Sequence, residues 1–120
     1  MNEETNLDLI NTQLKAYNNK DIDLFLKCWD TNAKMFLHPK TLIADGIEQI
    51  KERHLIRFQE PDLYAKLISR NYYDGKIVDS EVVTRNLPEG KATIEVLAIY
   101  EIENEKISKV WFLMGEPKFL

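Results

Sequence analysis

The sequence has little of the chemistry that metal, disulfide and nucleotide sites commonly use. Its 120 residues include one cysteine, Cys28, which excludes an internal disulfide and a thiolate zinc cluster. The two histidines, His38 and His54, do not form an HExxH motif, and no glycine-rich phosphate loop or GxSxG motif is present. We therefore expect no metal and no other cofactor.

Positive charge and long apolar runs are also scarce. Lysine and arginine number 16 against 20 acids, for a net charge of −4, and the basic residues are scattered. Proteins that bind a phosphate backbone normally present a basic face, so no nucleic-acid partner is expected. No apolar run approaches the roughly 20 residues that span a bilayer. The first ten residues are acidic and polar, unlike a secretory signal, so we expect a cytoplasmic protein without membrane contact.

What is present is the balance of an ordinary globular chain. Of its residues, 44% are hydrophobic and 30% are charged. No repeat or linker interrupts the sequence, and 120 residues suit one domain, so we expect a single domain over residues 1–120.

The first half of the sequence has helical periodicity. Apolar residues spaced three or four apart predict a helix over residues 5–18, which the pair Asn18 and Asn19 would end. A shorter helix is expected after Asp21, which would cap it. Residues 33–38 predict a first strand.

A third helix is predicted over about residues 46–59. Asp45, followed three residues later by Glu48, is typical of a capping box. Pro61 would then keep the helix from continuing.

The second half of the sequence predicts two hairpins. Asp74-Gly75 is a strong turn signal between strands over residues 64–73 and 76–86. A two-residue turn places Arg70 opposite Asp79, an ion pair worth roughly 0.2–1 kcal/mol. Two further strands, 91–102 and 107–114, would be joined near Asn104.

The last two strands are apolar at consecutive positions, over residues 96–100 and 110–114. A strand with one wet face alternates, so these patterns predict a sheet covered on both faces. The helices can cover only one face. We therefore expect a homodimer through the outer face of the sheet, the alternative being that loop and tail segments cover it.

Three segments resemble the nuclear transport factor 2-like superfamily, in its branch of SnoaL-like polyketide cyclases and ketosteroid isomerase. They are AYNNKDIDLFLKCWDTNAKMFLHP, ADGIEQIKERHLIRF and AIYEIENEKISKVWFLMGEP. The resemblance spans about residues 7–117. Within the superfamily, the sequence is similar to bacterial steroid isomerase-like proteins. It implies an α+β fold in which three N-terminal helices pack on a curved, mostly antiparallel sheet. This fold is a cone-shaped half-barrel with an apolar pocket at its open end.

The same resemblance argues against steroid isomerisation. Ketosteroid isomerase uses an aspartate base, a tyrosine donor and a protonated aspartic acid. The base position falls at or next to His38, the tyrosine position at Gln13, one turn before Tyr17, and the protonated aspartate position at Ala98. Alanine cannot donate a hydrogen bond to a developing oxyanion, a loss that costs on the order of a hundredfold in rate.

Several residues are candidates for the lining of the pocket, because aromatic and methionine side chains with a few polar groups suit an apolar ligand. They are Tyr17, Trp29, His54, Phe58, Ala98, Tyr100, Phe112 and Met114. Plain core packing is the alternative for the aromatic residues and Met114, and a solvated helix face is the alternative for His54.

Four charged residues and the cysteine have more ordinary interpretations. Arg53, Arg70, Asp79 and Glu81 are compatible with either the pocket or a solvated surface. Cys28 is expected to be a small core residue rather than a nucleophile.

Three hypotheses for function follow. In the first, the cone cavity binds a small, largely apolar molecule without the ketosteroid isomerase acid–base set. In the second, the protein is an isomerase, cyclase or dehydratase that moves a proton on a small carbonyl compound without a metal. His38 would then be the base and Tyr17 or Gln13 the donor. In the third, it is a dimeric protein-interaction module whose pocket is filled by its own side chains.

Overall fold

The three helices lie in the first half of the chain, in a computed structural model that describes residues 3–120. Helix α1 spans Glu3–Asn18, α2 spans Ile22–Lys27 and α3 spans Ile47–Arg57. The Asp21 side chain accepts a hydrogen bond from the Leu24 N–H and so caps α2, as its sequence predicts. Among residues 3–120, no helix is long and apolar enough to cross a membrane.

The strands form one sheet, in the order β2-β1-β6-β5-β4-β3, with β7 paired to β5. Their bounds are Trp29–Leu37 (β1), Thr41–Asp45 (β2), Tyr64–Tyr73 (β3), Lys76–Leu87 (β4), Gly90–Glu103 (β5), Lys106–Met114 (β6) and Lys118–Phe119 (β7). All pairs are antiparallel except β1 with β6, which is parallel. The sheet is therefore mostly antiparallel, as expected.

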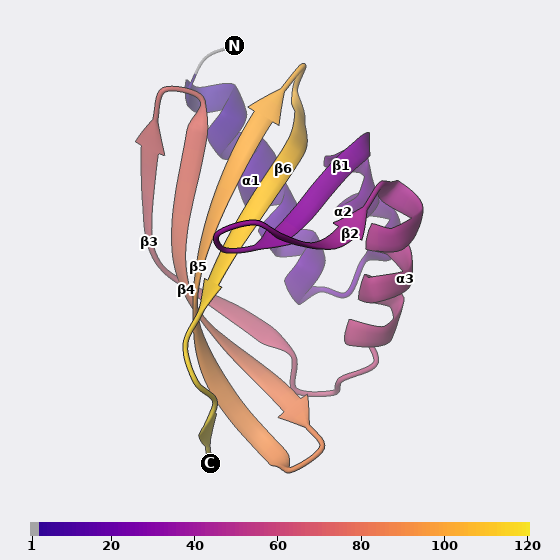
Figure 1. The fold of residues 1–120 in the computed structure, drawn as a ribbon, viewed down its shortest axis with the longest axis vertical. Helices are drawn as coiled ribbons and strands as arrows, with labels where there is room; N and C mark the ends of the chain where they lie inside the picture. Colours follow the sequence, from indigo (N-terminus) through magenta and orange to yellow (C-terminus); the bar gives the residue numbers. More distant parts are fainter. Residues whose placement is uncertain (1–2) are drawn as a thin grey trace.

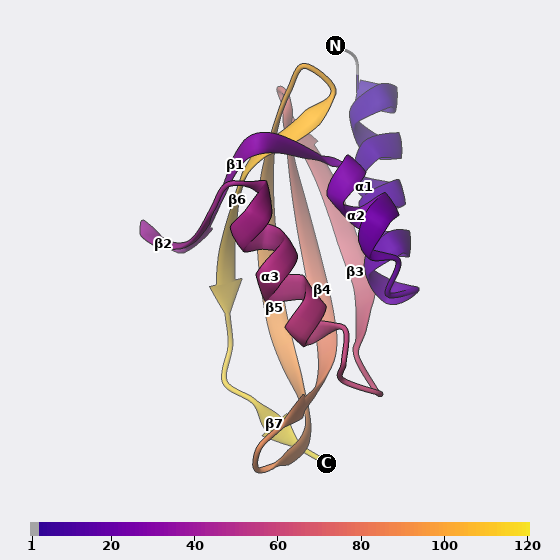
Figure 2. The same cartoon turned by 90° about the vertical axis from the view of Figure 1, so that its right-hand side faces the viewer.

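The helices gather on one side of the curved sheet. Figure 1 shows α1 behind the long strands and α3 beside them, and the view turned by 90° in Figure 2 shows α3 in front of β4 and β5 with α1 to their right. The Asn18 side chain joins the end of α1 to the start of β3, because its Nδ2 donates to the Ala65 carbonyl at 3.0 Å and its Oδ1 accepts from the Ala65 N–H at 2.8 Å. The end of α1 is therefore tied to β3, the strand at one edge of the sheet.

The first hairpin has the predicted register. Tyr73 lies opposite Lys76, and Arg70 lies opposite Asp79. Gly75, in the turn, has a φ of +84°, a conformation that glycine adopts without the strain of a side chain. Local turn chemistry therefore aligns the strands next to the turn, and the register shifts only further along, between Leu67 and Ser69.

One local prediction was wrong, and two strands were missed. Asp45 does not cap α3: it ends β2 and pairs with Lys34, and Gly46 occupies the N-cap without a side-chain hydrogen bond. Helix α1 ends at Asn18, where the pair Asn18 and Asn19 predicted its end, and the left-handed residue that follows is Lys20, with a φ of 56°. Strands β2 and β7 were not predicted, because each is a short edge segment whose pairing depends on a distant strand.

Candidate functional site

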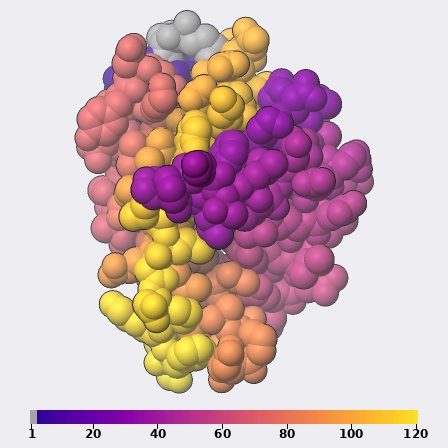
Figure 3. All heavy atoms as spheres, in the orientation of Figure 1, coloured from indigo at the N-terminus to yellow at the C-terminus, as the bar shows by residue number. Residues whose placement is uncertain are grey.

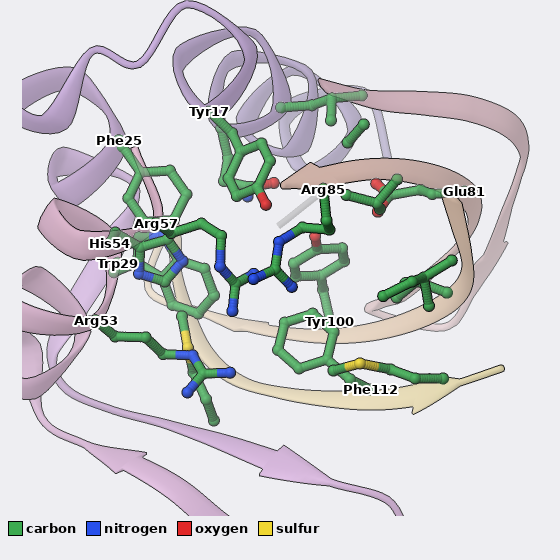
Figure 4. Close-up of a pocket in the computed structure, with 18 residues that line it drawn as sticks. Tyr17, Phe25, Trp29, Arg53, His54, Arg57, Glu81, Arg85, Tyr100 and Phe112 are labelled. Atoms are coloured by element: carbon green, nitrogen blue, oxygen red, sulfur yellow. The ribbon is translucent and has the colours of Figure 1, made fainter. Parts of the chain in front are cut away.

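A pocket of about 70 Å³ lies between the helices and the concave face of the sheet (Figure 4). It is lined by Gln13, Leu14, Tyr17, Phe25, Trp29, Met35, Arg53, His54, Arg57, Ala65, Glu81, Val83, Arg85, Ile94, Val96, Tyr100, Phe112 and Met114. An engineered cavity that binds benzene has about 150 Å³. This pocket alone therefore holds a small group, and a longer ligand would extend through its opening.

The sheet side of the pocket is built by strand alternation. Ile94, Val96 and Tyr100 of β5 line it, together with Phe112 and Met114 of β6. Successive side chains of a strand point to opposite faces, so these residues share the concave face. They give the pocket an apolar wall.

Glu81 is the only carboxyl group on the lining within residues 3–120, and it comes from β4. It is 7% exposed and lies opposite Val96 in the sheet. Burial, assisted by the negative charge of Asp79, raises the pKa of Glu81 to about 7, although Arg70 opposes the rise. At neutral pH this carboxyl group can both hold and release a proton.

Two phenol groups also face the pocket. Tyr17 comes from α1 and Tyr100 from β5 (Figure 4). Burial raises the pKa of Tyr17, opposed by the nearby Arg57 guanidinium, and burial raises the pKa of Tyr100 well above its ordinary value. Both phenols therefore stay protonated at neutral pH and can act as hydrogen-bond donors.

Three arginines stand at the opening, which we call the mouth: Arg53, Arg57 and Arg85. Arg85 holds the Glu60 carboxylate through two hydrogen bonds, Nε–Oε1 at 2.8 Å and Nη2–Oε2 at 2.9 Å, while Arg57 Nε lies 3.6 Å from Glu60 Oε2. Burial would raise the pKa of Glu60, but the hydrogen bonds and charge of Arg85 outweigh it and lower that pKa. Burial, with the charges of Arg57 and Arg85, lowers the pKa of Arg53.

The mouth opens onto a surface groove of about 470 Å³. Arg53, Arg57 and Arg85 line both the pocket and this groove, so they separate the interior from the surface. The groove is also bordered by Ile43, Gln49, Glu52, Ile56 and Glu60. A molecule that enters the pocket from the groove therefore passes the three guanidinium groups.

Two buried polar atoms on the lining lack a hydrogen-bond partner within residues 3–120. They are Gln13 Oε1 and Trp29 Nε1, in residues that are 5% and 4% exposed. Buried polar groups are normally satisfied, so an acceptor and a donor are available to whatever occupies the pocket.

His54 forms part of the helix side of the pocket. It is 6% exposed, its Nδ1 lies 2.7 Å from the Ile50 carbonyl oxygen, and its ring centroid is 4.5 Å from that of Phe25. Burial lowers its pKa to about 4, although the hydrogen bond to Ile50 opposes the shift. His54 is therefore neutral at pH 7, with Nδ1 as the donor.

Most of the residues expected at the pocket lie on its lining, and three do not. Tyr17, Gln13, Trp29, His54, Tyr100, Phe112 and Met114 line it. Phe58 packs behind the lining, with its ring edge toward Tyr17 at 5.5 Å between centroids. Ala98 is fully buried opposite Asp79.

His38 is the third expected residue outside the lining. It follows the last residue of β1, its side chain is exposed, and its N–H donates to the Phe112 carbonyl at 2.8 Å. The expectation that a base at the end of the first strand opens into the cavity therefore does not match the geometry, because the chain turns outward there.

Of the four charged residues that the sequence assigned to either the pocket or the surface, two line the pocket and two do not. Arg53 and Glu81 line the pocket, whereas Arg70 and Asp79 form an ion pair of their own. Arg70 donates to both carboxylate oxygens of Asp79, at 2.7 and 2.8 Å, and Asp79 is fully buried. Cys28 is buried, and burial raises the pKa of its thiol, which disfavours the thiolate.

Sequence reasoning missed Arg57 and Arg85 and did not commit Glu81 to the pocket. A signal for Glu81 was present, because Ile77, Asp79, Glu81 and Val83 alternate along one strand face. Two apolar neighbours on that face indicate an interior position for the acids between them. No comparable signal existed for Arg57 and Arg85, which meet only through the fold.

No group of three or more histidine, cysteine, aspartate or glutamate side chains within residues 3–120 is placed to hold a metal ion. The side chains of the pocket themselves offer hydrogen bonding, positive charge and proton exchange at a buried carboxyl group.

Comparison with solved structures finds many that share this fold. An uncharacterized cystatin fold protein from Novosphingobium aromaticivorans is 23% identical, with a TM-score of 0.83 over 89% of this chain and 96% of that one. A putative SnoaL-like polyketide cyclase from Jannaschia sp. is 13% identical, with a TM-score of 0.80 over 94% and 87% of the two chains.

A third similar structure contains a small molecule. It is a hypothetical protein with a ketosteroid isomerase-like fold from Catenulispora acidiphila, in complex with trimethylamine, 8% identical, with a TM-score of 0.74 over 87% and 82% of the chains. No protein-family model matches the sequence, and neither does any curated protein.

Proposed function

From the nuclear transport factor 2-like fold that this chain has, we propose that it binds a small, largely apolar molecule in the cone cavity. The observation that carries the proposal is the lining: an apolar wall interrupted by Gln13 Oε1 and Trp29 Nε1, two buried polar atoms without a partner within residues 3–120. Ligand sites typically combine a mostly apolar surface with a few convergent polar groups. One structural neighbour was solved in complex with a small molecule, trimethylamine.

A titration with neutral apolar probes tests this proposal. 1-Hexanol and cyclohexanone would be added to ¹⁵N-labelled protein, and we expect chemical-shift changes at lining residues with saturation at millimolar concentrations. Val96→Phe fills the pocket and should abolish the changes. Leu97→Phe is the matched control, because it adds the same ring on the opposite face of β5. Shifts that persist in Val96→Phe would place the binding elsewhere.

The second candidate function is proton transfer on a small carbonyl compound. It is favoured by Glu81, whose pKa of about 7 suits a group that takes and returns a proton at neutral pH. Glu81 would take the α-proton of a ketone to give an enolate and then return it, while Tyr17 or Gln13 donates to the oxygen. In the form that uses His38 as the base, the exposed position of that residue gives no support.

Deuterium exchange separates these two versions of the enzyme hypothesis. Exchange at the α-carbon of cyclohexanone in D₂O would be followed by NMR with wild type, Glu81→Gln and His38→Ala. If Glu81 is the base, Glu81→Gln removes the catalysed exchange and His38→Ala leaves it unchanged. The absence of catalysed exchange by the wild type would favour binding alone.

The homodimer is proposed through the outer face of the sheet. Leu97 lies opposite Leu113 and Ile99 opposite Trp111, on the face turned away from the pocket. In Figure 3, the yellow spheres of β6 and the C-terminal segment and the purple spheres of the β1–β2 hairpin lie at the centre of the face toward the viewer, with salmon and orange strands at the left and the magenta α3 at the right. An interaction module with a filled pocket is less well supported, because the cavity is open.

Sedimentation equilibrium tests the dimer directly. The wild type should sediment with twice the chain mass, and Leu97→Glu should sediment as a monomer. Leu24→Glu, at an exposed position of α2, is the matched control and should remain a dimer. A monomeric wild type at millimolar concentration would contradict the proposal.

A further inference from the structure

The arginines of this chain are distributed unequally. Only four of the 16 basic residues are arginine, and three of those four, Arg53, Arg57 and Arg85, line the mouth of the pocket. The fourth, Arg70, holds the buried carboxylate of Asp79. None of the lysines lines the pocket or the groove within residues 3–120. Arginine differs from lysine in offering a planar fork that matches a carboxylate with two hydrogen bonds.

The charges at the mouth do not balance internally. Arg57 and Arg85 share a single carboxylate, that of Glu60, and Arg85 already shows the two-bond geometry with it at 2.8 and 2.9 Å. Among residues 3–120, the only acidic side chain on the pocket lining is Glu81, whose carboxyl group is partly protonated at neutral pH. A chain with a net charge of −4 therefore concentrates positive charge at this one opening.

Arg53 is the guanidinium group at the mouth that has no acidic partner in the described part of the chain. No ion pair or hydrogen bond is found for it among residues 3–120, although it is only partly exposed. Glu52 lines the outer groove, but its side chain is exposed and it is absent from the pocket lining. Taking a cation partly out of water without a counter-charge is unfavourable, so an incoming anion gains from pairing with Arg53.

The side chains around the arginines define the rest of the ligand. In Figure 4 the side chains of Arg57 and Arg85 extend toward one another across the opening, with Arg53 below and Phe112 and Tyr100 beside them. A group held at the guanidiniums thus lies next to the apolar wall of the pocket. One end of the ligand is expected to be charged and the other apolar.

We propose that the ligand is an amphipathic organic acid, whose carboxylate is held at the mouth by Arg53, Arg57 and Arg85 and whose apolar part enters the pocket. The inference rests on the proposed binding function and specifies its ligand class. Arg53 supplies the unpaired cation, and Arg57 and Arg85 supply further donors beside their shared Glu60.

Three probes of one chain length test the charge requirement: hexanoate, hexanamide and hexylammonium. Each would be titrated into the protein at pH 7.5 by protein-observed NMR, in 50 mM and in 500 mM NaCl. We expect hexanoate to bind at least tenfold more tightly than hexanamide at low salt, with that advantage reduced at high salt, and hexylammonium to bind most weakly.

Variants of α3 locate the charge. Arg53→Gln should weaken hexanoate binding about tenfold and leave hexanamide binding unchanged, and Arg53→Lys should restore part of the loss. Lys51→Gln is the matched control: it removes the same charge from the same helix, at an exposed position outside both cavities, and should leave hexanoate affinity within twofold. The amide cross-peaks of each variant report that it is folded.

The outcomes separate the two proposals. Equal affinity of wild type for hexanoate and hexanamide would overturn the acid inference and leave the apolar pocket standing. An equal effect of Arg53→Gln and Lys51→Gln would overturn the role of Arg53, because a general field would then explain the preference. If none of the three probes shifts the lining residues, the binding function fails together with the inference.

Discussion

Replacement of Glu81 by glutamine should stabilise the protein at alkaline pH. Glu81 has an ordinary pKa of 4.5 in the unfolded chain and about 7 in the folded protein. The folded state therefore binds its proton more tightly, and stability falls as the pH rises through this interval. Glutamine has nearly the same shape and carries no charge at any pH, so it does not pay this cost.

The size of the effect follows from the shift. The difference between 4.5 and about 7 corresponds to about 3 kcal/mol when Glu81 is fully ionised in both states. At pH 5 the same group costs less than about 1 kcal/mol, because it is still largely protonated in the folded protein. The stability of Glu81→Gln relative to wild type should therefore increase by about 2–3 kcal/mol between pH 5 and pH 8.

Urea denaturation at half-unit steps of pH measures this difference directly. For a chain of this length, the increase amounts to about 10 °C in Tm at pH 8. Glu95→Gln is the matched control, because it makes the same substitution at an exposed position of the neighbouring strand. If the difference in the free energy of unfolding between Glu81→Gln and wild type is constant from pH 5 to pH 8, the pKa of Glu81 is not raised in the folded protein and the reasoning is refuted.

Three other predictions concern charged and capping groups. Because the pKa of His54 is lowered from 6.5 to about 4, the protein should lose about 3 kcal/mol of stability as the pH falls through that range. In acid denaturation, His54→Gln should remove this dependence of stability on pH, and His38→Gln should keep it. Arg70→Met should lower the free energy of unfolding, measured in urea, by about 3–5 kcal/mol, because Asp79 is left buried and unpaired. The double variant Arg70→Met with Asp79→Leu should recover most of this loss. Equal losses in the single and the double variant would argue against a role of the ion pair. Asp21→Ala should cost about 1 kcal/mol through the lost cap of α2, with an unchanged midpoint as the contrary result.

The hairpins of the sheet were predictable because their signals are local. Asp74-Gly75 fixes the register of β3 with β4, and the structure has Arg70 opposite Asp79 as the turn requires. The start of α3 was not predicted correctly, because the residues before it are compatible both with a helix cap and with the end of a strand. Asp45 followed by Glu48 has the pattern of a capping box, but the chain uses Asp45 to end β2. The pairing of β2 with β1 decides this, and no short-range pattern reports it.

The candidate site was predictable where it coincides with an apolar stripe. Tyr17 and His54 lie on the faces of their helices that line the pocket. The position of Phe112 on the lining follows from the alternation of side chains along β6. The charged half of the site was not predictable in the same way. Arg57 and Arg85 are far apart in sequence, and they come together because both pair with the Glu60 carboxylate.

The pocket groups share a property that links stability to binding. Glu81 is held in its protonated form by burial, Arg53 is partly withdrawn from water, and Trp29 Nε1 has no partner within residues 3–120. Each of these features costs folding free energy, and neither Glu81 nor Arg53 belongs to the hydrophobic cluster around Ile10 and Ile107, whereas Trp29 does. Strained electrostatics concentrated on one lining is typical of a site adapted to something other than stability. A ligand that pairs with Arg53 and donates or accepts at these atoms should therefore raise the free energy of unfolding by the amount that mass action gives, about 2.7 kcal/mol at a hundred times its Kd.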